Sequence, residues 1–94
     1  MYIVVRKYAG SGASELMDTI EQKSDDVKEV ISGTPGFVSY AAFREGDGGM
    51  TITACQDKAG VDESSERAAA WVKENHTADV DPPEITEGPV FIQF

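Results

Sequence analysis

The chain is poor in the residues that form covalent or metal cross-links. Among its 94 residues, Cys55 is the only cysteine and His76 is the only histidine. A single cysteine excludes an internal disulfide. The lone histidine has no second histidine or nearby cysteine with which to hold a zinc-type metal. We therefore expect a fold without an internal disulfide and without a bound metal.

Long hydrophobic runs are missing as well. The amino terminus has four apolar residues, at positions 2–5, before the charged Arg6 and Lys7. This run is too short for the core of a signal peptide and far too short to span a bilayer. A cytoplasmic location is the resulting expectation.

Positive charge is scarce. The chain has 8 Lys and Arg against 17 Asp and Glu, which gives a net charge of −9. The acidic residues are spread from Glu15 to Glu87 and indicate a solvated surface. Such a surface repels phosphate backbones and anionic lipids, and the basic residues are too scattered to offset it. We expect neither a nucleic-acid partner nor a membrane partner.

What the chain does contain is the pattern of one α+β domain over residues 1–94. Runs of β-branched and aromatic residues predict strands, and apolar residues recurring at helical spacing predict helices. In chain order we expect a strand at 2–8, a helix from 14 to about 33, strands at 37–44 and 50–56, a helix at 61–75, a rigid linker at 76–83, and a last strand at 84–94 that is strongest at 90–94.

Local chemistry predicts where these elements end. Ser14 is a good helix N-cap, and Gly33 stands where a helix ends with a positive φ. Residues 24–26, Ser-Asp-Asp, are poor in a helix interior, so the first helix should kink or restart there. Residues 45–49 are turn sequence and predict a hairpin between the middle strands.

This order predicts a ferredoxin-like βαββαβ fold, a four-stranded antiparallel sheet with two helices on one face. The middle strands are nevertheless apolar on both sides. In one, Phe37, Ala41 and Phe43 oppose Val38, Tyr40 and Ala42; in the other, Met50, Ile52 and Ala54 oppose Thr51, Thr53 and Cys55. Because the second apolar face needs a cover, we expect a homodimer that packs sheet to sheet.

Four segments carry a resemblance to a known family. They are Pro-Gly-Phe-Val-Ser-Tyr at 35–40, Thr-Ile-Thr at 51–53, Asp-Lys-Ala-Gly at 57–60, and Ala-Ala-Ala-Trp-Val-Lys-Glu-Asn at 68–75. Together they resemble small proteins of the dimeric α+β barrel superfamily, in the branch similar to antibiotic biosynthesis monooxygenases. The resemblance covers nearly the whole chain and implies a dimeric α+β barrel.

The resemblance also implies a small-molecule site between sheet and helices. The superfamily includes cofactor-independent oxygenases of polycyclic aromatics, haem-degrading enzymes, isomerases and members without known activity. It makes this chain a candidate cofactor-independent monooxygenase for an aromatic or phenolic substrate. The alternative is a non-catalytic dimeric module whose pocket is filled by its own side chains. An open apolar cavity of a few hundred cubic ångströms with two convergent polar groups would favour the first.

Haem degradation fits the sequence poorly. The haem-degrading members carry an asparagine on the first strand and a histidine well beyond the tryptophan of the second helix. Here the first strand has no asparagine, and His76 follows Trp71 by only five residues. We therefore expect no haem turnover.

Four residues are candidates for a substrate pocket, Arg6, Tyr40, Trp71 and His76, and no catalytic residue is assigned. Tyr40 and Arg44 share a strand face and could orient an anionic or phenolic ligand, with Arg6 if its face agrees. Trp71 could stack on a planar ligand, although a core role is favoured. His76 could act as acid or base near neutrality, although a helix C-terminus already explains it.

Two further signals point to structure and not to chemistry. Cys55 lies on a strand expected in the middle of the sheet and has no cationic sequence neighbour to activate it, so a core position is predicted. Residues 10–15 follow a strand and open a helix, as a dinucleotide-binding turn does. Glu15 replaces the third glycine there and would repel a pyrophosphate.

Overall fold

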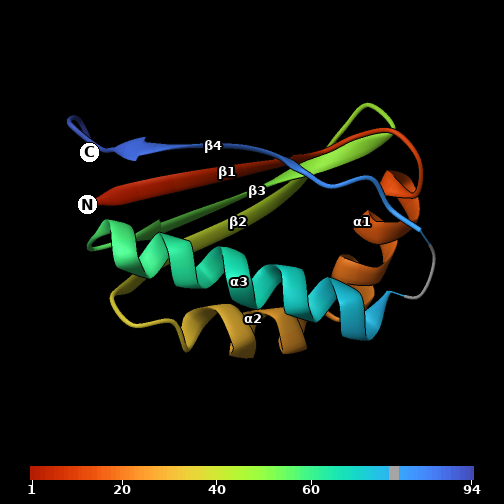
Figure 1. Cartoon of the computed structure of the whole chain (residues 1–94), viewed down its shortest axis with the longest axis horizontal. Helices are drawn as coiled ribbons and strands as arrows, with labels where there is room; N and C mark the ends of the chain where they lie inside the picture. The colour runs from red at the N-terminus through yellow and green to blue at the C-terminus, as the bar shows by residue number, and fades with distance from the viewer. Residues whose placement is uncertain (77–78) are drawn as a thin grey trace.

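A computed structural model of the chain describes residues 1–76 and 79–94. Its elements are β1 (Tyr2–Tyr8), α1 (Ala13–Gln22), α2 (Ser24–Ser32), β2 (Phe37–Glu45), β3 (Gly48–Cys55), α3 (Lys58–Asn75) and β4 (Glu84–Pro89). The strands form one antiparallel sheet in the order β2-β3-β1-β4, and all the helices lie on one side of it (Figure 1). This is the predicted ferredoxin-like architecture.

The first predicted helix consists of two helices. The backbone of Lys23 leaves helical geometry, with φ −112° and ψ 33°, and α2 begins at the next residue. The break places Asp25 and Asp26 in the first turn of α2, where the helix dipole favours acidic side chains. The predicted restart is confirmed, and the described residues place three helices over the sheet where two were expected.

The turn into α1 is shaped by contact with the distant segment 79–81. The N-cap of α1 is Gly12 and not the predicted Ser14. Only glycine fits at this position, because the φ of Gly12 is 79° and a Cβ there would overlap the carbonyl oxygen of Asp79. Asp81 accepts a hydrogen bond from the Ser11 N–H at 3.3 Å and donates its own N–H to the Ser11 carbonyl at 3.1 Å. The glycines that resemble a dinucleotide turn therefore serve close packing.

Two other helix ends also differ from the prediction. Gly33 has φ −75°, and the left-handed residue is Gly36, with φ 75°, where the chain turns into β2. α3 begins at Lys58 rather than Val61, because the Asp57 side chain caps the helix by accepting the Gly60 N–H at 2.9 Å.

The last strand was predicted too long, and the expectation that it is strongest at 90–94 was wrong. β4 ends at Pro89, which pairs with Tyr2 at the start of β1. The Val90 N–H still donates to the Met1 carbonyl at 2.8 Å, but the described residues offer no neighbouring strand beyond it. Strand-forming residues need a partner to form a ladder. Residues 77 and 78 of the predicted linker lie outside the described residues.

The strand register shows which residues face the helices. Val4 pairs with Thr53, and Thr53 pairs with Tyr40, so all three lie on the helix side. A bulge between Phe37 and Ser39 turns Phe37 to this side too, contrary to the predicted alternation. The core lies here, formed by Tyr8, Ala13, Leu16, Met17, Ile20, Val27, Ile31 and Trp71.

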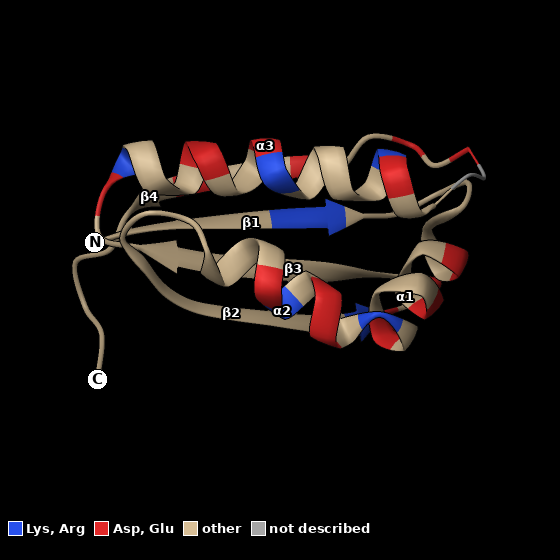
Figure 2. Ribbon diagram, turned by 90° about the horizontal axis from the view of Figure 1, so that it is seen from below, with Lys and Arg blue, Asp and Glu red and all other residues tan. Residues whose placement is uncertain are grey.

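Acidic residues lie on the outer turns of all three helices, as a solvated surface requires (Figure 2). The opposite face of the sheet has a different character. No described element covers it (Figure 1), and Phe43 is 46% exposed. Its centre is apolar, as predicted, and carries Ile3, Val5, Ala41, Phe43, Met50, Ile52 and Ala54, while Lys7, Ser39, Glu84 and Thr86 lie on the same face toward its edges and ends.

We predict that this face holds two copies of the chain together. Sedimentation equilibrium at micromolar concentration should give about twice the chain mass. Ile52→Arg, in the middle of the face, should give the monomer mass, because a buried unpaired charge is strongly unfavourable. The matched change Ala70→Arg, on the exposed side of α3, should leave the dimer intact. A monomeric wild-type chain would contradict the prediction.

Candidate functional site

A cavity of about 620 Å³ opens between α1, α2 and β2. It lies on the helix side of the sheet at its β2 edge, beside the break between the two helices. The apolar stripes of α1 and α2 end over this edge, and β2 has no further strand beyond it to fill the space. Its apolar walls are Met17, Ile20, Val27, Ile31, Phe37, Ala42 and Phe43.

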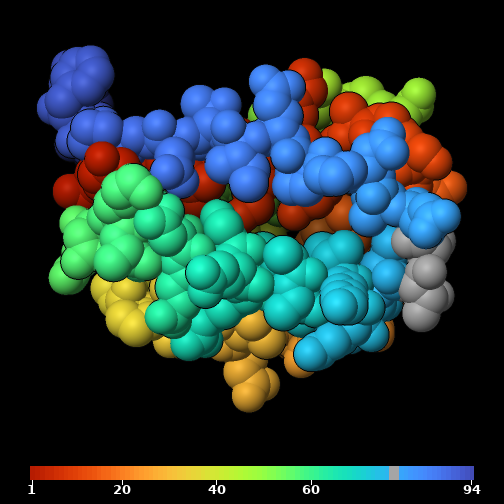
Figure 3. Space-filling view, viewed as in Figure 1, coloured from red at the N-terminus to blue at the C-terminus, as the bar shows by residue number. Residues whose placement is uncertain are grey.

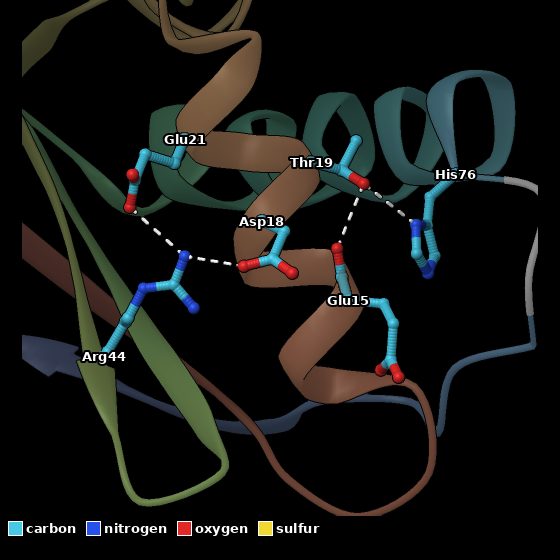
Figure 4. A network of polar contacts seen from close by, with 6 residues as sticks. All are labelled: Glu15, Asp18, Thr19, Glu21, Arg44 and His76. Carbon is cyan, nitrogen blue, oxygen red and sulfur yellow. Dashed lines mark hydrogen bonds and ion pairs between the residues drawn. The ribbon is translucent and has the colours of Figure 1, made fainter.

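Polar side chains reach the cavity from the sheet and from the rim. Tyr40 comes from the middle of β2, and Arg44 comes from its end. The Arg44 guanidinium donates to Asp18 Oδ1 at 2.9 Å and to Glu21 Oε1 at 3.1 Å (Figure 4). These bonds raise the pKa of Arg44 and hold its charge at the mouth. Glu21 and Lys28 also line the opening.

Tyr40 is a hydrogen-bond donor at neutral pH. Burial raises the pKa of Tyr40 to about 12; the nearby charge of Arg6 and a hydrogen bond with Thr51 only partly offset this. The phenol therefore keeps its proton far above physiological pH. It can donate to a substrate oxygen, but it cannot serve as a general base.

Arg6 faces the same side of the sheet as Tyr40. It pairs with Thr51, which pairs with Ala42, and Ala42 shares a strand face with Tyr40 because the two are two residues apart. It does not line the large cavity. Its side chain is 1% exposed and donates only to hydroxyl groups, on Thr51, Thr53, Ser64 and Ser65. Arg44, at the end of β2, pairs with the surface acids Asp18 and Glu21, and no such pair is found for Arg6 among the described residues.

Trp71 belongs to the core cluster and is 6% exposed. Its indole N–H donates to Asp26 Oδ2 at 2.8 Å, which joins α3 to the first turn of α2. Trp71 lines only a small void of about 20 Å³, together with Tyr8 and Tyr40. The favoured core role agrees with this position.

His76 follows the last residue of α3, and its backbone N–H donates to the Val72 carbonyl at 2.9 Å. Its Nδ1 lies 3.1 Å from Thr19 Oγ1, and that hydroxyl donates to the Glu15 carbonyl at 3.0 Å (Figure 4). Because the single hydroxyl proton is used on Glu15, the proton between Thr19 and His76 belongs to Nδ1. His76 joins α3 to α1 and lines none of the cavities described here.

The four predicted residues thus do not share one pocket. Tyr40 lines the large cavity, Trp71 packs beside it, and Arg6 lines a second cavity at the opposite edge of the sheet. The sequence did not indicate the contribution of α2, or that Glu21 would be held at the rim by Arg44. The helical spacing of Ile20, Val27 and Ile31 predicted a buried helix face. It did not indicate that part of this face borders an open cavity.

Cys55 is fully buried beside Val4 and Val61, as predicted. Burial and the nearby Asp57 raise the pKa of its thiol, so it is a core residue and not a nucleophile. Within the part of the chain that the structure describes, no group of three His, Cys, Asp or Glu side chains is arranged to hold a metal. No helix in that part is long and apolar enough to cross a bilayer.

Several solved structures have this arrangement. The cofactor-independent oxygenase SnoaB from Streptomyces nogalater has a TM-score of 0.65 at 16% identity, covering 98% of this chain and 94% of its own. A monooxygenase from the gene ActVA-Orf6 of Streptomyces coelicolor, in complex with nanaomycin D, gives 0.64 at 16% identity, covering 98% and 92%. The haem degrader MhuD from Mycobacterium tuberculosis, with two haems in its active site, gives 0.63 at 14% identity, covering 99% and 97%. The chain shares their fold.

The expected likeness in fold to monooxygenase-like proteins is thereby confirmed. No family model matches the sequence, and no curated protein matches it. A shared fold at such low identity does not carry activity with it. The chemistry of this chain has to be argued from its own residues.

We predict that Trp71 is a structural residue. Trp71→Ala should lower the free energy of unfolding by about 3–5 kcal/mol, because it removes a buried aromatic ring from the core. Trp71→Phe keeps a ring but loses the bond to Asp26, so it should cost less. Urea unfolding followed by circular dichroism measures both losses. A mild alanine variant, with saturable quenching of wild-type tryptophan fluorescence by planar ligands at micromolar concentration, would instead place Trp71 in a binding site.

Proposed function

We propose that the chain binds a planar aromatic or phenolic molecule in the large cavity and oxygenates it without a cofactor. The observation that carries this proposal is the cavity itself, with its volume of about 620 Å³ and its mostly apolar walls. A volume of this size is in the range of small-molecule sites. The alternative, a module whose pocket is filled by its own side chains, is less well supported because this space is open.

Two polar groups converge on the cavity and can fix the orientation of such a ligand. Tyr40 offers a half-buried hydroxyl from the sheet, and Arg44, whose Nη2 is held by Asp18 and Glu21, offers its remaining N–H groups at the rim. Phe37, whose side chain lies on the helix side of the sheet, offers aromatic surface for a planar ring. This combination selects a flat molecule with one polar end directed toward Tyr40.

The chemistry that suits this site draws its electrons from the substrate. A methylene carbon activated by neighbouring phenol rings is oxidised by four electrons to a carbonyl, and O₂ is reduced by the same four electrons. One oxygen atom enters the carbonyl, and the other leaves as water with the two methylene hydrogens. The protein has to bind, orient and exclude water, and to stabilise the enolate form of the substrate that reacts with oxygen.

Tyr40 and Glu21 divide the proton chemistry in this proposal. Tyr40 keeps its proton, so it donates a hydrogen bond to the substrate oxygen that gains negative charge. Glu21 is the acidic residue among those that line the cavity, and its Oε1 accepts a hydrogen bond from Arg44 at 3.1 Å. It is our candidate to accept the proton that leaves the substrate.

We predict that the protein accelerates oxygen uptake by 1,8-dihydroxyanthrone, a planar phenol with an activated methylene. An oxygen electrode should show one O₂ consumed for each ketone formed. Tyr40→Phe should lower the rate by roughly 100-fold, the usual effect of deleting one donor to a developing oxyanion. The binding constant should change much less, because the phenyl ring keeps its place in the wall.

Two variants serve as controls for this experiment. Tyr2→Phe removes a phenol that lines none of the described cavities and should leave the rate unchanged. Ala42→Trp fills the cavity from β2 and should abolish binding and turnover together. Saturable binding that Ala42→Trp abolishes, without any oxygen uptake, would support the non-catalytic module instead.

We predict no haem turnover, although the haem degrader MhuD has the same fold. β1 presents the long, hydroxyl-bound Arg6 and no asparagine, and His76 is engaged with Thr19 outside the cavity. Haem incubated with the protein, a reductant and oxygen should lose its Soret band no faster than with heat-unfolded protein. Efficient protein-dependent loss of the band would contradict this assignment.

The homodimer and the cytoplasmic location are part of the same proposal. The uncovered apolar face of the sheet supports a second copy of the chain as the partner. The lone, buried and unactivated Cys55 is compatible with a reducing compartment.

A further inference from the structure

A second cavity, of about 300 Å³, lies at the β4 edge of the sheet, away from the large cavity at the β2 edge. It is formed where α3 and the segment before β4 pass over β1. Figure 3 looks onto this side, with α3 in cyan, the later segment in blue and β1 in red between them. Most of its wall is apolar, contributed by Ala69, Val72, Val80, Pro82, Pro83 and Ile85.

Arg6 brings an uncompensated positive charge to this cavity. It lines the cavity although its side chain is 1% exposed. Among the described residues no carboxylate oxygen lies within 4.0 Å of its nitrogens, whereas Lys7, Arg44, Lys58 and Arg67 all have acidic partners. Buried charges in proteins are normally paired, because desolvation is costly. The neutral hydroxyls around Arg6 accept hydrogen bonds from its N–H groups, but they do not neutralise its positive charge.

One edge of the Arg6 guanidinium has the geometry of a carboxylate site. Nε and Nη2 present two parallel N–H groups, and both donate to the same atom, Ser65 Oγ, at 3.3 and 3.1 Å. A carboxylate would place two oxygens on this edge, one for each donor. Ser65 lines the second cavity. Its hydroxyl therefore occupies the position from which a carboxylate entering the cavity would accept from both Nε and Nη2 of Arg6. The other edge is held by Thr51, Thr53 and Ser64.

We propose that the second cavity binds a small apolar monocarboxylate, with its carboxylate on the Nε–Nη2 edge of Arg6. The Ser65 hydroxyl then donates to the same carboxylate, and the apolar body lies against Ala69, Val72 and Ile85. A single positive charge balances a single negative one. The acidic Asp81, in the same wall, disfavours a dianion such as phosphate. The apolar wall disfavours small hydrated anions.

Benzoate is the probe, with benzamide as its neutral isostere and inorganic phosphate as the dianion. In an NMR titration, millimolar benzoate should shift the amide signals of Ser65, Ala69 and Ile85 saturably. Benzamide and phosphate should bind at least 10-fold more weakly, because the proposed selectivity rests on one charge and an apolar body. Benzamide or phosphate binding as tightly as benzoate would overturn the proposal.

Variants of the chain give a second test. Arg6→Met should abolish benzoate binding. Ser65→Asp should do the same while raising the unfolding temperature by roughly 5 °C, since it supplies the missing carboxylate within the fold. Ser32→Asp, a matched change at the wall of the large cavity, should leave benzoate binding unaltered. If Arg6→Met fails to fold, Ser65→Asp still decides the matter, because unchanged benzoate binding by that variant contradicts the site. The oxygen-uptake experiment concerns the other cavity, so the two proposals can fail separately.

Discussion

The helix layer depends on the way Trp71 ties α3 to α2. Its ring fills the space between these helices and the sheet, and its N–H is held by Asp26 at 2.8 Å. Asp26 is available for this bond because the chain breaks at Lys23 and restarts, which places it in the first turn of α2. The same break separates the paths of α1 and α2 along the β2 edge. The packing of Trp71 therefore holds the helices against the middle of the sheet, and the two larger cavities lie toward the β2 and β4 edges.

The distribution of polar groups follows from that arrangement. Tyr8, Tyr40 and Trp71 surround the small void between the two larger cavities, so each cavity has its own polar set. Thr51 lies between the sets, since it accepts from Arg6 at 3.3 Å and lines the small void with Tyr40. Through this arrangement Arg6 lowers the pKa of Tyr40, but burial dominates and keeps the phenol neutral.

Much of the fold could be predicted because it rests on local patterns. The hairpin followed from the turn residues at 45–49, and the helix restart from Ser-Asp-Asp at 24–26. The errors have non-local causes. Gly12 replaces Ser14 as a cap because Asp79 lies against it. The strand at 90–94 lacks a neighbour within the described chain. Phe37 changes side through a bulge that no sequence signal marked.

The candidate site was harder to predict for the same reason. Arg6 is separated from Ser64 and Ser65 by 58 and 59 positions, so neither its burial nor its lack of an acidic partner is visible in the sequence around it. Tyr40 could be named because strand alternation shows which residues share a face. Trp71 and His76 are chemically versatile residues whose contacts, with Asp26 and Thr19, are also long-range. The residue types suggested candidates for a binding site. Only the tertiary contacts distinguish a residue that lines a cavity from one that is packed in the core.

The buried charge of Arg6 is not explained by the fold alone. The fold is shared with oxygenases and with a haem degrader at 14–16% identity, so the fold alone does not determine the chemistry. In this chain the middle of β1 carries a guanidinium whose donors are satisfied by hydroxyl groups, but whose charge has no acidic partner among the described residues. An apolar side chain there would pack without desolvating a charge. A buried cation with an unpaired charge, at the wall of an apolar cavity, is therefore better explained by a ligand than by stability.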